Sequence, residues 1–284
     1  MLAYAVAMVI SDSIAKQLSS LNNIIVIVWY RYVFHTVSLA LLTGSHTFIS
    51  KNKNVVGNHR IQLFRGLFLA LSTSAFFISI ASMPLAEAMA LLYIFPIVSV
   101  ILSAVLLKES VSKFQILFIL TAFIGVNLIL NTSGAIHLVP GLFGLAGGVF
   151  MGIYMFLTKY MSADATPLIS SLYSGVVGIV FVPFLPGFEF ILFDNQSFLL
   201  GVMMGVFAAT GHFCMFLSMK YAAATVVSPF AFFEVVFAAI IGSLWFGDML
   251  TVTTGAGIAL LVITGVAFAM HSQQQEVLKS NNHS

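Results

Sequence analysis

One acid stands within the apolar stretch FAFFEVVFAAIIGSLWF, residues 230–246. The other sixteen positions are apolar, aromatic or small, and Glu234 is the exception. In lipid, an acid at the centre of a helix costs about 2.5–3.5 kcal/mol, so it must gain an interaction there. We interpret Glu234 as a central carboxylate that binds a cationic substrate group or takes up a proton. The alternative is a protonated or hydrogen-bonded acid that only holds helices together.

Three more charged residues lie in apolar stretches near the N-terminus. Arg31 keeps its charge, so it must face water, substrate or a carboxylate. We expect it to clamp a substrate carboxylate or phosphate; the alternatives are a structural ion pair and a side chain that snorkels outward. Asp12 and Lys16 are four residues apart, the spacing of an ion pair within one helix. The other interpretation is a polar stripe along the substrate cavity, in which Asp12 lies deeper.

An acid and two histidines form a second tier of candidates. Glu87 follows Pro84, and a proline with an acid in the first turn is typical of a helix start. A gate is the alternative role for Glu87. His35 and His212 are candidates for proton coupling because histidine titrates near physiological pH. Helix packing is the alternative for both.

Aromatic residues could supply a stacking wall for an aromatic or adenine-like substrate. Tyr93 and Phe230 are our candidates for substrate contact, and the wider set is Tyr93, Tyr154, Tyr173, Phe230, Phe232 and Phe233. Ordinary core or lipid contact is the alternative for each. The glycines of residues 144–152 have the spacing of close helix packing rather than of a nucleotide loop. We predict no metal site and no cofactor.

The elements that position these residues are predicted to be membrane helices. Charged residues make up 7 % of the 284 residues, against about 25 % in ordinary soluble domains. A helix needs about 20 residues to cross a bilayer. Breaks at charges, proline, asparagine and glycine predict ten spans: 2–19, 24–44, 60–82, 84–108, 113–130, 139–160, 166–187, 197–219, 223–247 and 250–271.

The chain also resembles itself. The segment PLAEAMALLYIFPIVSVILSAVLLKESVS (84–112) aligns with AAATVVSPFAFFEVVFAAIIGSLWFGDMLT (222–251). We therefore predict two five-helix repeats, residues 1–130 and 139–271, followed by a disordered cytoplasmic tail, 272–284. Because five is odd, the second repeat must be inverted.

Charge placement gives this topology an orientation. If both termini are cytoplasmic, nine basic residues fall on the cytoplasmic side, as the positive-inside rule requires. These are Lys51, Lys53, Arg60, Arg65, Lys108, Lys113, Lys159, Lys220 and Lys279.

Several of these segments resemble the EamA branch of the drug/metabolite transporter superfamily. They are PLAEAMALLYIFPIVSVILSAVLLKE (84–109), MKYAAATVVSPFAFFEVVFAAIIGSLWFGD (219–248), SDSIAKQL (11–18) and WYRYVF (29–34). The family usually has Glu-Pro where this chain has Glu234-Val235. The resemblance implies a carrier of amino acids, nucleotide-like metabolites or drugs in the bacterial inner membrane. PLAEA and the AK pair are similar to a subgroup that includes S-adenosylmethionine uptake carriers.

The predicted function is secondary transport of a small amphoteric solute by alternating access, coupled to protons or to exchange. A drug exporter of the same fold is the alternative, and an intramembrane enzyme or a channel is a weaker one. No P-loop is present, so this chain is not expected to hydrolyse ATP. Expected partners are a small-molecule substrate and membrane lipid, without nucleic acid. The sequence leaves the substrate, the direction of transport and the oligomeric state open.

Overall fold

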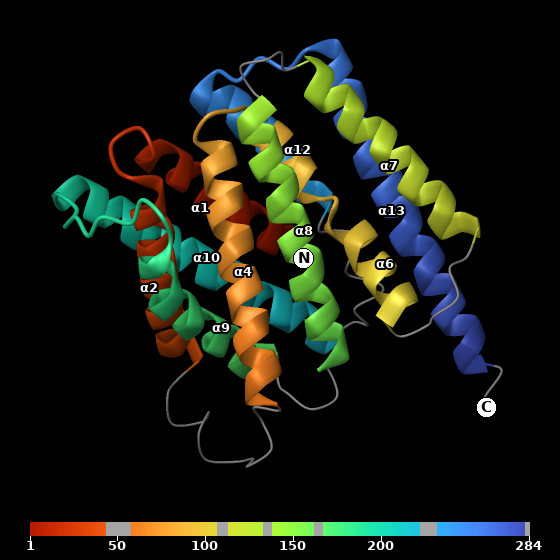
Figure 1. Ribbon diagram of the computed structural model, residues 1–284, viewed down its shortest axis with the longest axis horizontal. Helices are drawn as coiled ribbons and strands as arrows, with labels where there is room; N and C mark the ends of the chain where they lie inside the picture. Colours follow the sequence, from red (N-terminus) through yellow and green to blue (C-terminus); the bar gives the residue numbers. More distant parts are fainter. Residues whose placement is uncertain (44–57, 107–112, 133–137, 162–166, 222–231, 282–284) are drawn as a thin grey trace.

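The computed structural model describes residues 1–43, 58–106, 113–132, 138–161, 167–221 and 232–281, and all regular structure in these ranges is helical (Figure 1). The helices of the first half are α1 (Leu2–Leu18), α2 (Ile24–Thr43), α4 (His59–Ile80), α5 (Leu85–Leu92), α6 (Phe95–Leu106) and α7 (Lys113–Thr132). Those of the second half are α8 (Leu138–Tyr160), α9 (Pro167–Phe181), η2 (Val182–Phe184), α10 (Asn195–Tyr221), α12 (Phe233–Ile241), η4 (Gly242–Phe246) and α13 (Val252–Asn281).

These helices make the chain a multi-pass membrane protein. Five described segments are long and apolar enough to cross a bilayer: Ile24–Leu41, His59–Ile80, Leu85–Leu106, Leu138–Thr158 and Asn195–Met215. Shorter apolar helices lie at Ile116–Leu128, Ile169–Phe184, Phe233–Phe246 and Val252–Ala267. Each of the ten ranges expected from the sequence contains helix.

The fourth expected span is interrupted, which the sequence analysis did not predict. Helix α5 ends at Leu92, and α6 begins at Phe95. Pro96 has no backbone N–H to donate toward Leu92, so a continuous helix would lose a hydrogen bond here. Helix α8 packs closely against this break, because a Cβ on Gly148 would lie 2.7 Å from the Leu92 carbonyl oxygen. The helix-packing role expected for the glycines of residues 144–152 is therefore confirmed.

The C-terminal end of the chain differs from expectation as well. We predicted disorder over 272–284, but α13 continues as helix to Asn281. The segment SQQQEVLK holds no proline or glycine and is rich in residues of good helix propensity, so the helix extends past its apolar part. Residues 282–284 lie outside the described residues.

Helices from the two halves pack mainly on each other. Helix α4 packs on α8 and α9, while α1 packs on α10 and α12. Helix α2 contacts both α10 and α9, and α5 contacts both α8 and α12. Helices α7 and α13 run side by side along one edge of the bundle (Figure 1). The core therefore lies between the halves.

Long-range hydrogen bonds identify the two ends of the bundle. The amino group of Met1 donates to Ser218 Oγ at 2.8 Å, which places the start of α1 beside the end of α10. We call this the Met1 end. At the opposite, Lys16 end, Lys16 Nζ donates to the Met83 carbonyl oxygen at 3.0 Å, between α4 and α5. Helix α4 therefore begins at the Met1 end.

Candidate functional site

Glu234 is buried where α12 meets α1 and α5. It lies in the first turn of α12 and is 5 % exposed. The hydroxyls of Tyr4 on α1 and Tyr93 at the C-terminus of α5 lie close enough to its carboxyl group to interact with it. One carboxyl oxygen, Oε1, is buried and has no hydrogen-bond partner in the described part of the chain. A buried acceptor left open in this way is costly unless a proton or ligand occupies it.

Asp12 and Arg31 form an ion pair that joins α1 to α2. Arg31 Nη1 donates to Asp12 Oδ1, and the Asp12 side chain is 4 % exposed. The guanidinium also lies over the Phe77 ring of α4, 4.9 Å from its centroid. The ion pair expected between Asp12 and Lys16 within α1 is therefore wrong. Asp12 pairs with Arg31 on the next helix because this contact is largely shielded from water, which could otherwise solvate the two charges.

The charges of this central group do not cancel. Asp12 and Arg31 neutralise each other, and Glu234 lies close enough to Asp12 for their charges to interact. With all three groups ionised, the net charge is −1. The arrangement can therefore hold one proton or one cationic group at Glu234, while the charge of Arg31 is already balanced by Asp12. We call Tyr4, Asp12, Arg31, Tyr93 and Glu234 the central cluster.

Lys16 instead bridges the two halves at its own end of the bundle. Its Nζ lies 2.9 Å from Asp248 Oδ2, between η4 and α13. The same carboxyl oxygen accepts the backbone N–H of Leu85 at 3.0 Å, where α5 begins. An anion at a helix N-terminus is favoured by the unpaired N–H groups there. Asp248 itself is positioned by Gly247, whose left-handed φ of 67° suits glycine.

The aromatic wall is only partly present. The Tyr93 ring packs at a tilt against the rings of Phe232 and Phe95, whose centroids are 5.1 and 5.3 Å away. Phe230 lies outside the described residues. Tyr4 belongs to the central cluster and was missed, although it lies two turns from Asp12 on the same face of the helix. That spacing of eight residues is the signal that could have found it.

The structure brings the two histidines together, which the sequence analysis did not predict. The rings of His35 on α2 and His212 on α10 lie 4.8 Å apart, edge to face. His212 Nδ1 donates to the Ala208 carbonyl oxygen at 2.8 Å. His35 Nε2 is buried and has no hydrogen-bond partner among the described residues. Arg31 is near enough to both rings for their charges to interact.

Glu87 lies in the first turn of α5, as the helix-start interpretation predicts. It is 4 % exposed, so it is buried within the bundle in this conformation. Its role as a gate stays a prediction.

Arg65 was grouped in the sequence analysis with basic residues that flank the connector before α4. The structure corrects this: Arg65 is 2 % exposed and contacts α9 and α8. The sequence does not show that Arg65 is buried while Arg60 is exposed, because both residues lie near the start of one helix but on different faces. Only the packing of α9 against α4 reveals it.

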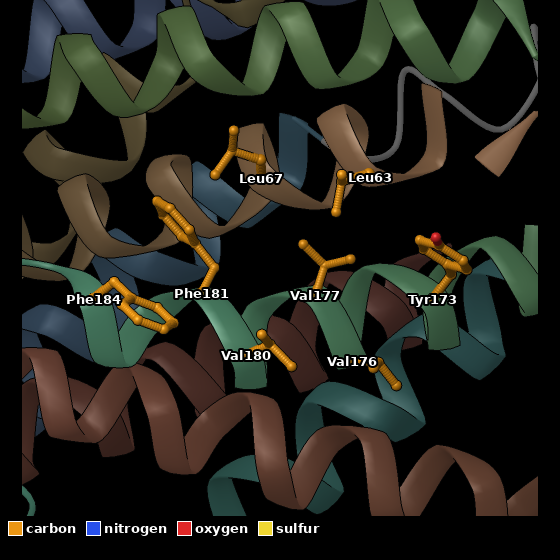
Figure 2. Close-up of a pocket in the computed structure, with 8 residues that line it drawn as sticks. All are labelled: Leu63, Leu67, Tyr173, Val176, Val177, Val180, Phe181 and Phe184. Carbon is orange, nitrogen blue, oxygen red and sulfur yellow. The ribbon is translucent and has the colours of Figure 1, made fainter. Parts of the chain in front are cut away.

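The described cavity is separate from the central cluster. A groove of about 550 Å³ runs between α4 and α9, and its walls are almost entirely apolar (Figure 2). Its lining residues are Leu63, Leu67, Tyr173, Val176, Val177, Val180, Phe181 and Phe184. Several of them are exposed on the outside of the bundle. The groove therefore opens on the outer surface of the bundle, and Tyr173 lines it.

The sequence profile of the EamA-like transporter family matches residues 1–131 and again residues 139–270. The chain belongs to this family. It is a membrane transporter of the drug/metabolite transporter superfamily, as the resemblance of its motifs implies.

Individual proteins support the same assignment. The chain is 25 % identical over 268 residues to an uncharacterized transporter of Helicobacter pylori strain J99, covering 89 % of this chain and 87 % of that one. It is 36 % identical over 93 residues to the uncharacterized transporter YyaM of Bacillus subtilis, 30 % of each chain. A protein of known crystal structure, 16 % identical, matches 94 % of this EamA-like chain and 95 % of its own with a TM-score of 0.63. That last likeness concerns the fold alone.

Proposed function

We propose that this EamA-like protein is a secondary transporter that binds the cationic group of a small solute, or a proton, at Glu234. The observation that carries the proposal is the buried Oε1 atom of Glu234, which has no partner in the described residues. A protein keeps an open acceptor in a membrane interior only if something occupies it during function. Secondary transporters place such groups near the midplane, between their repeats.

The chemistry of the neighbours supports a cation rather than an anion at this position. Tyr93 lies near the acid and its ring contacts that of Phe232, and aromatic faces attract cations. The arginine of the cluster is already paired with Asp12. An amphoteric solute, such as an amino acid or an S-adenosylmethionine-like molecule, would place its cationic group at Glu234. Its carboxylate would compete with Asp12 for Arg31.

We further propose that the two halves are inverted repeats that move by alternating access. The packing supports this, because the most extensive contacts between the halves have counterparts when the halves are exchanged. Helix α4 on α8 corresponds to α10 on α1, and α4 on α9 corresponds to α10 on α2. Helices α7 and α13 occupy matching places and pack on each other. The double match of the family profile also supports two repeats.

The proposed orientation places the Met1 end in the cytoplasm of a bacterial cell, across the inner membrane. Arg60 begins α4 at the Met1 end, and exposed basic residues favour the cytoplasmic side. Both termini then lie inside, and the Lys16 end, with Asp248, faces outward.

The experiment is transport by purified protein in liposomes. Counterflow with preloaded amino acids or S-adenosylmethionine should give saturable uptake, because a carrier exchanges solute through one site. Glu234→Gln removes the ionisable group while keeping its size, and it should lower gradient-driven uptake at least about 30-fold, since a hydrogen bond to a charge is worth about 2 kcal/mol. The matched control is Glu189→Gln, because Glu189 is exposed between η2 and α10.

Two results would contradict the proposal. Uptake by Glu234→Gln at the parental rate, with the parental dependence on pH, removes Glu234 from the mechanism. Flux that rises without saturation indicates a pore instead of a carrier.

A further inference from the structure

A second buried charge, Arg65, lies between α4 and α9. The sequence analysis placed it only among the basic residues of the cytoplasmic side. Its Nη2 donates to the Ser170 carbonyl oxygen at 2.7 Å and to Ser174 Oγ at 3.0 Å. Its Nη1 donates to Gln62 Oε1 at 3.1 Å. Gln62 is held in turn by Ser170 Oγ at 2.8 Å. Neutral acceptors from two helices therefore fix the guanidinium in one orientation.

No carboxylate neutralises this charge within the described residues. The ion pairs found there are Lys16–Asp248 and Arg31–Asp12, and neither involves Arg65. A guanidinium carries five N–H groups, and the three hydrogen bonds leave the Nε–H and one Nη1–H unused. Nε is buried without a partner. An arginine keeps its charge at any physiological pH, so this charge cannot be discarded as an acid's can.

The arrangement is closed in the conformation described. The ring of Tyr154 on α8 covers the guanidinium, with 5.1 Å between Cζ and the ring centroid. Beside it, α4 and α9 are in tight contact, because a Cβ on Gly66 would lie 2.6 Å from Val177 Cβ. Because Arg65 is 2 % exposed, a ligand reaches the two unused N–H groups only when the helices packed around it separate. Such a ligand favours the separated conformation, since it binds only there.

We infer that Arg65, with Gln62 and Ser174 as its supports, is an oxyanion-binding site that opens when α4 and α9 part. The ligand is a carboxylate or phosphate group, whose geometry matches the N–H donors of a guanidinium. It comes either from a soluble anion or from a lipid headgroup. The site is separate from Glu234. Its ligand is an anion, whereas the ligand proposed for the central cluster is a cation.

Thermal unfolding of the purified, delipidated protein tests the site. The melting temperature is measured in sodium acetate and in sodium phosphate, against sodium chloride at the same ionic strength. At ten times the dissociation constant, a site-bound anion should raise the melting temperature on the order of 3 °C. Arg65→Gln should abolish this rise. Arg60→Gln is the matched control, because Arg60 lies on the same helix but is exposed, and it should keep the rise.

A second variant covers the case in which Arg65→Gln does not fold. Arg65→Lys keeps the charge but loses the planar set of donors, so it should retain less than half of the parental rise. The proposal is overturned if Arg65→Lys or Arg65→Gln shows the full parental rise, because the anion then binds elsewhere.

Lipid nanodiscs separate the two sources of the anion. The same variants are compared in phosphatidylglycerol and in phosphatidylcholine, without acetate or phosphate. A stabilisation by phosphatidylglycerol that depends on Arg65 identifies a lipid headgroup, whereas stabilisation only by the soluble anions identifies a solute. Absence of any Arg65-dependent effect in all of these conditions overturns the proposal. Because the readout is stability, its failure leaves the transport test of Glu234 unaffected.

Discussion

Two carboxylates of the second half, the partly buried Asp248 and the buried Glu234, differ in how completely they are bonded. Asp248 accepts from Lys16 and from the Leu85 N–H, so it joins α1 to the start of α5. Two tyrosine hydroxyls lie near Glu234, which keeps one oxygen without a partner in the described residues. A satisfied charge contributes to the fold, whereas an open one costs stability. Asp248 therefore has the bonding of a structural acid, and the open oxygen of Glu234 is the feature on which its proposed function rests.

Asp12 is a third carboxylate in this comparison, and it is both buried and paired. Its substitution is predicted to have the largest effect on stability. Asp12→Asn leaves Arg31 buried without its counter-ion, which costs about 3–5 kcal/mol. Thermal unfolding in detergent should show a melting temperature lower by roughly 10 °C, at 2–4 °C per kcal/mol. The paired variant Asp12→Asn with Arg31→Gln should recover part of the loss. A melting temperature within about 2 °C of the parent in the single variant would contradict the ion pair.

Asp248 should rank next. Asp248→Asn weakens its interaction with Lys16 and its hydrogen bond to Leu85, and its side chain is 15 % exposed, so we expect a loss of about 1–3 kcal/mol. Lys16→Met removes the other partner and should produce a loss of similar size. The two losses should not add in the double variant, because both remove the same contact. Strict additivity would show that the bridge is absent in the folded protein.

Glu234 is predicted to behave in the opposite way. Glu234→Gln replaces an incompletely bonded acid by a neutral amide, so the melting temperature should stay within about 2 °C of the parent or rise. The same variant loses transport, as proposed above. A fall as large as that of Asp248→Asn would show that Glu234 is a structural acid, and the contrast would collapse.

Asp194 gives the smallest effect because it is exposed. Hydrogen bonds from Ser197 at the start of α10 hold the pKa of Asp194 below its usual value. A carboxyl with a lowered folded-state pKa stabilises the fold above its unfolded-state pKa, and this contribution disappears as the pH falls through the folded-state pKa. Asp194→Ala should therefore lower the melting temperature slightly at pH 7, and the difference from the parent should vanish in strong acid. A difference that is independent of pH would point to lost packing instead.

Much of the architecture was predictable because lipid imposes simple rules on a sequence. Low charge and runs of about 20 apolar residues predicted the helices, and every expected range contains one. Glu234 was proposed as a site residue for the same reason, since an acid in such a run has a cost that demands an explanation. Pro96 is a sequence signal for a helix break, but we gave more weight to the apolar run around it and predicted one continuous span.

Contacts between residues on different helices could not be predicted from their spacing in the sequence. Asp12 and Lys16 have the spacing of an ion pair, yet they bind Arg31 and Asp248, because neighbouring helices offered better geometry than their own. Arg65 was placed with the basic residues of the cytoplasmic side because it lies near the start of the span expected at 60–82. Its burial follows from the contact between Gly66 and Val177, which pairs residues more than one hundred positions apart. Such contacts exist only after the halves have assembled.

The continuation of α13 to Asn281 has a practical meaning for anyone who labels this protein. A helix rises 1.5 Å per residue, so the stretch after His271 forms a stem about 15 Å long. A fluorescent reporter attached behind it would be carried clear of the bilayer surface by a rod rather than a tether. Its orientation would then follow the tilt of α13, and depolarisation of the emitted light could report how that edge of the bundle moves during turnover.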